Sequence, residues 1–211
     1  MDDIAAILKQ ATVVPVLTIE RVEDAVPLGR ALTAGGLKVL EVTLRTDAAC
    51  ASIRRLKAEL RDAWIGAGTI LNLHGLDRAQ GAGADFFVSP GLHDGVLQAA
   101  SARRLPLLPG VATASEMMRG LAAGFTHFKF FPAEQLGGVA ALKGFAGPLP
   151  QCRFCPTGGV TVDNAADYLA LSSVVCVGGT WIAPPELIAE AQWAAITDRA
   201  AAAHRLAAAR A

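Results

Sequence analysis

The chain of 211 residues is 53% apolar and 18% charged, with 19 acidic residues against 19 basic ones. This composition excludes a disordered, coiled-coil or fibrous protein and allows a large core, so we expect a single domain over residues 1–211. A formal net charge of zero, without a run of Lys or Arg, argues against nucleic acid or an anionic membrane surface as a partner. The expected partner is a small soluble molecule.

The N-terminal residues and the hydropathy pattern indicate where the protein resides. The chain begins Met1-Asp2-Asp3-Ile4, which is acidic where a secretory signal peptide is basic. We find no window of about 18 uncharged apolar residues that could span a bilayer. We therefore expect a cytoplasmic protein that does not contact a membrane.

The four cysteines lie in apolar segments without the spacing of a disulfide framework, which favours reduced thiols. Cys152 and Cys155 have C-x-x-C spacing, but a structural zinc needs about four ligands and no second pair is present. The four histidines are isolated, with neither H-x-H nor H-E-x-x-H spacing. The sequence therefore predicts no metal site.

Short β-like apolar runs alternate with amphipathic helical stretches almost to the C-terminus. The patterns predict strands over residues 13–18, 38–44, 65–68, 86–88, 107–108, 127–131, 153–155 and 174–177. They predict helices over residues 22–34, 48–60, 73–82, 94–102, 114–123, 139–145 and 164–169. Glycines that follow two of these helices, Gly35 with Gly36 and Gly124, suit helix C-caps before the next strand.

Alternating strands and helices favour a mostly parallel sheet. Eight strand–helix units in 211 residues match the count and nearly the minimum length of a closed (β/α)8 TIM barrel. An open doubly wound sheet is the alternative, but no G-x-G-x-x-G follows the first predicted strand. We therefore expect an α/β protein with a single-domain barrel, whose Ala-rich segment 186–211 forms one or two helices on the outside.

The second predicted strand carries a carboxylate and a guanidinium. Glu41 lies inside an apolar segment and Arg45 follows four residues later, so the two side chains share one face of the strand. A buried carboxylate needs a partner. One interpretation is a structural ion pair in the barrel interior. The other is an acid/base carboxylate beside an anion-binding guanidinium.

The sixth predicted strand places an ammonium among aromatic rings. Lys129 lies between Phe128 and Phe130, with Phe131 following. Apolar surroundings disfavour the charged form, and a neutral amine is the nucleophile that forms a Schiff base with a carbonyl. A lysine on an edge strand that reaches to solvent is the alternative interpretation, although a closed barrel has no edge strand.

Two glycine pairs end the seventh and eighth predicted strands, Gly158 with Gly159 and Gly178 with Gly179. Either pair alone indicates little more than a turn. Because they lie at equivalent ends of adjacent strands, where barrels commonly bind phosphate, their backbone amides predict a phosphate site. With the lysine, the carboxylate and the arginine, this set predicts Schiff-base carbon–carbon chemistry on a phosphorylated 2-keto acid.

Six segments carry a family resemblance: VLEVTLRT at 39–46, GAGT at 66–69, SPG at 89–91, FKFFPAE at 128–134, RFCPTGG at 153–159 and GGTW at 178–181. Together they resemble the 2-keto-3-deoxy-6-phosphogluconate (KDPG) aldolases, which also act on 4-hydroxy-2-oxoglutarate (KHG). The resemblance implies a class I aldolase on a (β/α)8 barrel, usually a homotrimer, that requires no metal or organic cofactor. It implies cleavage of KDPG to pyruvate and glyceraldehyde 3-phosphate in the Entner–Doudoroff pathway, and of KHG to pyruvate and glyoxylate.

The resemblance also implies roles for residues at matching positions. Lys129 would form the Schiff base, and Glu41 would move protons as the acid/base. Arg45 and Thr69 would hold the pyruvoyl carboxylate. The remaining substrate contacts would come from Pro90 and Phe131 along the pocket, and from Thr157, Gly158, Gly159, Gly179 and Thr180 at the distal hydroxyls and phosphate. Thr180 departs from the family pattern, which usually has serine there, and its extra methyl group can crowd the phosphate.

Two other functions stay open at this stage. An aldolase for the C4-epimeric galactonate substrate would share the lysine chemistry and differ mainly at the residue before the first glycine pair, which is Thr157 here. The more distant alternative is a non-catalytic barrel that binds a phosphorylated ligand, with Lys129 in a structural role. Borohydride trapping with pyruvate distinguishes this binding protein from both aldolases.

Overall fold

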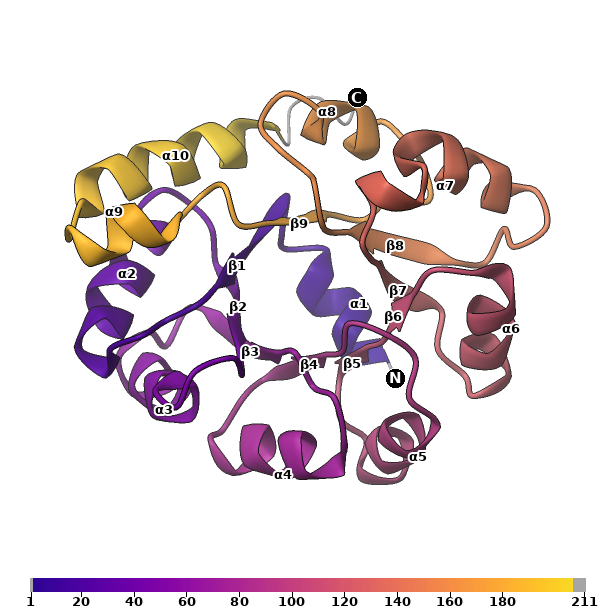
Figure 1. Ribbon diagram of the computed structural model, residues 1–211, viewed down its shortest axis with the longest axis horizontal. Helices are drawn as coiled ribbons and strands as arrows, with labels where there is room; N and C mark the ends of the chain where they lie inside the picture. Colours follow the sequence, from indigo (N-terminus) through magenta and orange to yellow (C-terminus); the bar gives the residue numbers. More distant parts are fainter. Residues whose placement is uncertain (1, 207–211) are drawn as a thin grey trace.

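The computed structural model describes residues 2–206. Nine strands are assigned in that range: β1 (Val13–Leu17), β2 (Val39–Thr43), β3 (Trp64–Gly68), β4 (Phe86–Val88), β5 (Leu107–Leu108), β6 (Gly110–Val111), β7 (His127–Phe130), β8 (Arg153–Pro156) and β9 (Val177–Gly179). The helices are α1 (Asp2–Leu8), α2 (Val22–Ala34), α3 (Ala49–Glu59), α4 (Leu73–Gly81), α5 (Asp94–Arg103), α6 (Ala114–Ala122), α7 (Gly138–Ala146), α8 (Ala165–Leu169), α9 (Pro185–Ala189) and α10 (Trp193–Arg205), with a 3₁₀ turn at Glu134–Leu136. Most of the helices surround a ring of strands (Figure 1).

The strands pair in parallel around the ring. One sheet has the order β5-β4-β3-β2-β1-β9 and a second the order β6-β7-β8. Pro109 alone separates β5 from β6, and isolated bridges from Phe154 to Val174 and from Thr157 to Gly178 connect β8 with β9 and the segment before it. The ring is therefore closed, and the α/β fold predicted as a (β/α)8 TIM barrel is confirmed.

Most predicted elements coincide with observed ones, and α2 has the predicted bounds. The eighth strand is shifted: predicted over residues 174–177, it runs over Val177–Gly179. The cause is a turn, in which the amide of Val174 donates to the carbonyl of Leu171. The fifth predicted strand continues past Pro109 as β6. Helix α1 was not predicted, because its seven residues are too few to show a helical period.

The N-terminal end of the barrel interior is apolar. α1 lies across the ring (Figure 1), where Ile4, Ile7 and Leu8 pack against inward-facing side chains of the strands. Those residues are Val14, Val39, Phe86, Val88, Leu108 and Cys155 in the strands, and Cys176 just before β9. This apolar floor leaves the polar interior residues toward the C-terminal ends of the strands, where parallel barrels build their sites.

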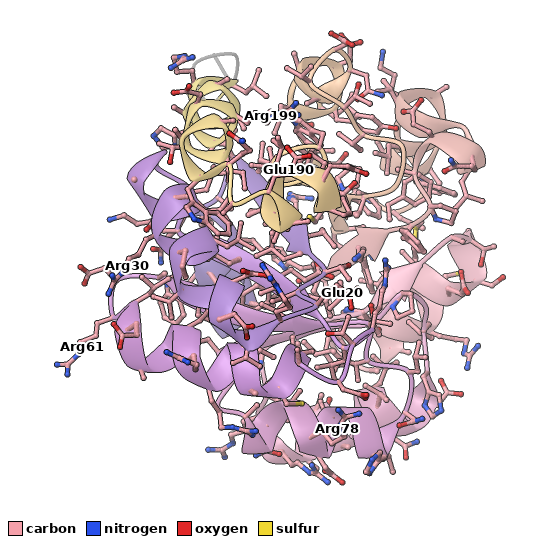
Figure 2. The ribbon with its side chains drawn as sticks, turned by 60° about the vertical axis from the view of Figure 1, so that its left-hand side comes forward. Glu20, Arg30, Arg61, Arg78, Glu190 and Arg199 are labelled. Carbon is pink, nitrogen blue, oxygen red and sulfur yellow. The ribbon has the colours of Figure 1, made fainter. Side chains whose placement is uncertain are left out.

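The outer helices shield the ring from solvent. α10 packs against α2, where the hydroxyl of Thr197 donates to the carbonyl of Ala31 at 3.0 Å. Of the predicted Ala-rich segment 186–211, the structure shows most of α9 and all of α10, and residues 207–211 lie outside the described range. The charged side chains of Arg30 and Arg61 point away from the barrel (Figure 2). Within residues 2–206, no helix has the length and apolar content needed to cross a membrane.

Candidate active site

Lys129 and Glu41 form an ion pair inside the barrel. Lys129 lies on β7 and Glu41 on β2, which are not neighbouring strands, so the two side chains meet across the interior. Nζ of Lys129 lies 3.1 Å from Oε1 and 3.5 Å from Oε2 of Glu41, and the two residues are 5% and 3% exposed. Nζ also lies 5.5 Å from the ring centroid of Phe131. A buried amine beside a carboxylate can pass a proton to it and become a nucleophile.

The structure decides two points that the sequence leaves open about this pair. Lys129 is not on an edge strand, because β7 pairs with β6 at Gly110 and with β8 at Cys155. The partner of Glu41 is Lys129 rather than Arg45. Residue spacing along one strand cannot reveal a partner that lies 88 positions away on the far side of the ring.

Gly68 leaves the room that the Glu41 side chain occupies. Gly68 ends β3, which lies next to β2, and a Cβ built on it would lie 2.1 Å from Oε1 of Glu41. Any other residue at position 68 would therefore displace the carboxylate. No local pattern singles out Gly68, although it belongs to the segment GAGT at 66–69 that carries part of the family resemblance.

Arg45 and Thr69 lie together beyond the ends of neighbouring strands. β2 ends at Thr43, so Arg45 belongs to the turn that follows and is exposed. Its Nε donates to Oγ1 of Thr69 at 3.2 Å. Thr69 follows β3 with a φ of +62°, in the left-handed region that is strained for a β-branched residue. The structure thus brings together the two residues that the resemblance assigns to a substrate carboxylate.

Pro90 and Phe131 follow the ends of β4 and β7 and are half-buried. The turn at Pro90 is fixed by Ser89, whose Oγ donates to the carbonyl of Gly91 at 2.8 Å and accepts from the amide of Gly110 at 3.3 Å. Ser89 is 2% exposed, and no local pattern in the sequence points to this role. The backbone of Pro90 also packs against Gly110, where a Cβ would lie 2.3 Å from the Pro90 carbonyl carbon.

Thr157 lies between the ion pair and the first glycine pair along the strand direction. Thr157 directly follows β8 and is 6% exposed. A Cβ built on Gly178 would lie 2.3 Å from Oγ1 of Thr157, so the threonine side chain covers that glycine. The next residues, Gly158 and Gly159, have φ values of +97° and +77°. Only glycine adopts such successive conformations without strain, which explains the pair.

The second glycine pair ends β9. A Cβ built on Gly179 would lie 1.6 Å from Cζ3 of Trp181, so the indole packs directly on the bare backbone. Thr180 lies between them and is exposed. The bridge between Thr157 and Gly178 places the ends of β8 and β9 side by side, as the sequence prediction of one shared site requires.

Metal-ligating residue types form no cluster in the described part of the chain. No disulfide joins any of the four cysteines, which all lie in the described range, and no group of three or more His, Cys, Asp or Glu that could hold a metal occurs in residues 2–206. Burial lowers the pKa of His127, and the charges of Arg153 and Lys9 lower it further. His127 begins β7 and lines a cavity of about 480 Å³ with Ile4 and Arg104, at the opposite end of the strands from the glycine pairs.

Comparison with known proteins gives the family of the chain. The family model described as KDPG and KHG aldolase matches residues 4–199. The chain is 49% identical to the KHG/KDPG aldolase of Escherichia coli (strain K12), over 92% of each protein. It is 52% identical to the 2-dehydro-3-deoxy-phosphogluconate aldolase of Zymomonas mobilis, over 87% of this chain and 88% of that protein.

Two solved structures extend the similarity to three dimensions. The KDPG aldolase of Legionella pneumophila, with pyruvate captured at low pH as a covalent carbinolamine intermediate, matches with a TM-score of 0.93 at 45% identity, over 95% of this chain and 98% of that chain. The Zymomonas mobilis ZM4 aldolase with 3-phosphoglycerate matches with a TM-score of 0.91 at 49% identity, over 97% and 96%. The matched model, the identities and the shared barrel agree, and the chain belongs to the KDPG and KHG aldolase family.

Proposed function

We propose that this chain is a class I aldolase that cleaves KDPG to pyruvate and glyceraldehyde 3-phosphate, and KHG to pyruvate and glyoxylate. The observation that carries the proposal is the buried pair of Lys129 and Glu41, with Nζ 3.1 Å from the carboxylate. The names of its relatives and the pyruvate adduct of the Legionella enzyme support it. The test is pyruvate release from each substrate, followed with a coupled lactate dehydrogenase.

In the proposed reaction, Lys129 and Glu41 share the covalent and proton-transfer steps. Glu41 accepts a proton from the Lys129 ammonium, and the free amine adds to the C2 ketone to give a carbinolamine. The proton held by Glu41 then leaves with the C2 oxygen as water, which produces an iminium and restores the carboxylate. The two protein groups that these steps need, the Lys129 amine and the Glu41 carboxylate, lie within 3.5 Å of each other.

Carbon–carbon cleavage uses the same two residues. The iminium accepts the electron pair of the C3–C4 bond while Glu41 takes the proton of the C4 hydroxyl, and the aldehyde leaves. The proton on Glu41 then passes to C3 of the enamine, and water hydrolyses the new iminium to release pyruvate and the Lys129 ammonium. No metal or organic cofactor takes part in this sequence.

The remaining candidate residues would hold the substrate at its two ends. Arg45 and Thr69 would bind the carboxylate, and a bidentate guanidinium fixes the carboxylate plane and so aligns the C3–C4 bond. The phosphate would bind at the second end, to the backbone of the paired glycines and to the Thr180 hydroxyl. Pro90 and Phe131 would line the pocket between the two ends.

Thr157→Val tests the choice between the gluconate and galactonate substrates. The Thr157 hydroxyl would bond a substrate hydroxyl, and losing such a bond costs about 0.5–1.5 kcal/mol, which is about two- to tenfold in kcat/KM. We therefore expect Thr157→Val to lower kcat/KM for KDPG and to narrow the preference over its C4 epimer. Steady-state kinetics on both epimers measure this. A wild type that prefers the galactonate epimer, or an unchanged ratio in the variant, contradicts the assignment.

Gly68→Ala tests whether the position of the Glu41 carboxylate matters. The added methyl group would displace Oε1, and a shift of about 1 Å at a reacting group can cost about 10²-fold in rate. We expect kcat for KDPG to fall by that order. Gly144→Ala is the matched control, because a Cβ at Gly144 in α7 meets nothing within 4 Å. Equal kcat values for the two variants would show that the Glu41 position is not critical.

The assembly and location of the enzyme are part of the proposal. We expect residues 1–211 to form one domain, the protein to be a cytoplasmic homotrimer, and no nucleic acid to bind. Sedimentation equilibrium of the purified protein measures the oligomeric state. A monomer or a dimer at micromolar concentration would contradict the trimer.

A further inference from the structure

Three consecutive carbonyls in the loop after β8 each accept a hydrogen bond from a neighbouring element. The pairs are Thr157 with the amide of Ala133 at 2.8 Å, Gly158 with the amide of Glu134 at 3.0 Å, and Gly159 with Nδ2 of Asn164 at 3.2 Å. Two of the donors belong to the loop after β7, and the third lies just before α8. Three successive peptide planes are therefore held in fixed orientations.

The amide edges of these planes point away from the donors. In a trans peptide the N–H points opposite to the C=O, so the anchored carbonyls aim the amides of Gly158, Gly159 and Val160 in the other direction. Within residues 2–206, neither the amide of Gly159 nor that of Val160 is found donating to a backbone carbonyl. Successive amides in a turn of this kind can enclose an anion.

Glu134 connects this loop to α8. Its side chain lies against Gly159, where a Cβ would be 2.6 Å from Cβ and Cγ of Glu134. Its Oε1 accepts a hydrogen bond from the hydroxyl of Tyr168, a fully buried residue of α8. Burial raises the pKa of Tyr168, and the bond to Glu134 raises it further, so the hydroxyl remains a donor at neutral pH.

The location of Glu134 also creates an electrostatic conflict. A carboxylate next to amides that bind a phosphate repels that phosphate unless it is turned away or partly neutralised. The bond from Tyr168 turns the carboxylate toward α8. Gly138 at the start of α7 leaves room for this contact, since a Cβ there would lie 2.9 Å from Oη of Tyr168 and 3.1 Å from Oε1 of Glu134.

We propose that Tyr168 is a positioning residue for phosphate binding, which acts through Glu134. Its hydroxyl holds Glu134 against the loop of residues 157–159, which keeps the loop amides aimed at the phosphate and the carboxylate charge away from it. This inference rests on the proposed function and deepens it. Part of the preference for phosphorylated over unphosphorylated 2-keto acids would then come from the contact between Tyr168 and Glu134, which lies on the opposite side of the loop from the substrate.

The test compares two substrates that differ in the phosphate. Tyr168→Phe keeps the buried ring and removes only the hydroxyl, so the fold should persist. We expect the KM for KDPG to rise about tenfold, as for the loss of a hydrogen bond to a charged group, while the KM for KHG stays within about twofold. The inhibition constant of inorganic phosphate against KHG cleavage should rise by about the same factor as the KM for KDPG.

A double variant separates the effect of the Glu134 charge on phosphate binding from the effect of the Glu134 position. Tyr168→Phe combined with Glu134→Gln removes the freed carboxylate charge, and we expect it to recover part of the lost affinity for KDPG. Thr197→Val is the matched control, because it removes a hydroxyl that links α10 to α2 at 3.0 Å, far along the chain from the loop. The control should leave both KM values unchanged.

Three outcomes would overturn the positioning role: an unchanged KM for KDPG in Tyr168→Phe, an equal rise for both substrates, or the same effect in Thr197→Val. Failure of the proposed function looks different, since the wild type would then cleave neither substrate. In that case the binding of inorganic phosphate, followed by ³¹P line broadening, still compares wild type with Tyr168→Phe. Equal phosphate affinities would again contradict the role of Tyr168.

Discussion

Lys129→Ala should leave a folded protein that has lost about 10⁴-fold or more in kcat for KDPG and KHG. Among residues 2–206, Lys129 is the buried lysine, 5% exposed and paired with Glu41 inside the barrel, so its loss removes the amine from that interior. Wild-type protein treated with pyruvate and borohydride should gain the mass of one reduced adduct, located by mass spectrometry on the peptide that contains Lys129. The variant should gain none, and circular dichroism should show that its barrel is intact.

Lys143→Ala is the control for this experiment. Lys143 lies on α7 and is exposed, so its loss should change neither kcat nor the adduct. An adduct on Lys143, or on Lys38 before β2, would contradict the assignment of Lys129. Absence of any adduct in a folded wild type would instead support the non-catalytic barrel that binds a phosphorylated ligand.

Glu41→Gln should lower kcat by about 10²- to 10⁴-fold, the usual contribution of a general acid/base. The substitution keeps the shape of the side chain and an oxygen that can accept from Nζ of Lys129, but the amide cannot take a proton from the C4 hydroxyl. Borohydride trapping with pyruvate should therefore still occur, at a lower rate. Single-turnover cleavage of KDPG and the rate of trapping, measured on the same preparation, separate the two steps.

Glu59→Gln provides the matched control for Glu41→Gln. Glu59 forms an ion pair with Arg30 at 2.9 Å on the surface, where such pairs contribute little. Its substitution should leave kcat and the melting temperature nearly unchanged. A Glu41→Gln protein that unfolds yet keeps full activity per folded molecule would show that the pair with Lys129 is structural, the alternative left open by the sequence.

The sequence predicts what local patterns encode. Apolar runs of a few residues, alternating with amphipathic stretches, were sufficient for the closed barrel and for most element bounds, because burial on both faces makes parallel strands uniformly apolar. Lys129 and Glu41 could be found for the same reason, since each interrupts such a run. The glycine pairs were recognisable because they follow directly after strands.

Other features of the site depend on which strands face each other, and no local pattern carries that information. The ion pair joins β2 to β7, so its two residues could be proposed separately but not as partners. Gly68 matters only because the Glu41 side chain leans over it. The shift of the last strand to Val177–Gly179 depends on the turn at Val174, which an apolar run does not reveal.

The floor formed by α1 has a consequence for the order of folding. α1 precedes all the strands in the chain, so it emerges before them during synthesis. Ile4, Ile7 and Leu8 nevertheless pack on side chains from strands as distant as Val14 in β1 and Cys176 just before β9. Their contact surface does not exist until the last strand has joined the ring, so docking of α1 is a late step. Until then, the N-terminal end of the barrel interior lacks its apolar floor, so a helix made before every strand is among the last elements to pack.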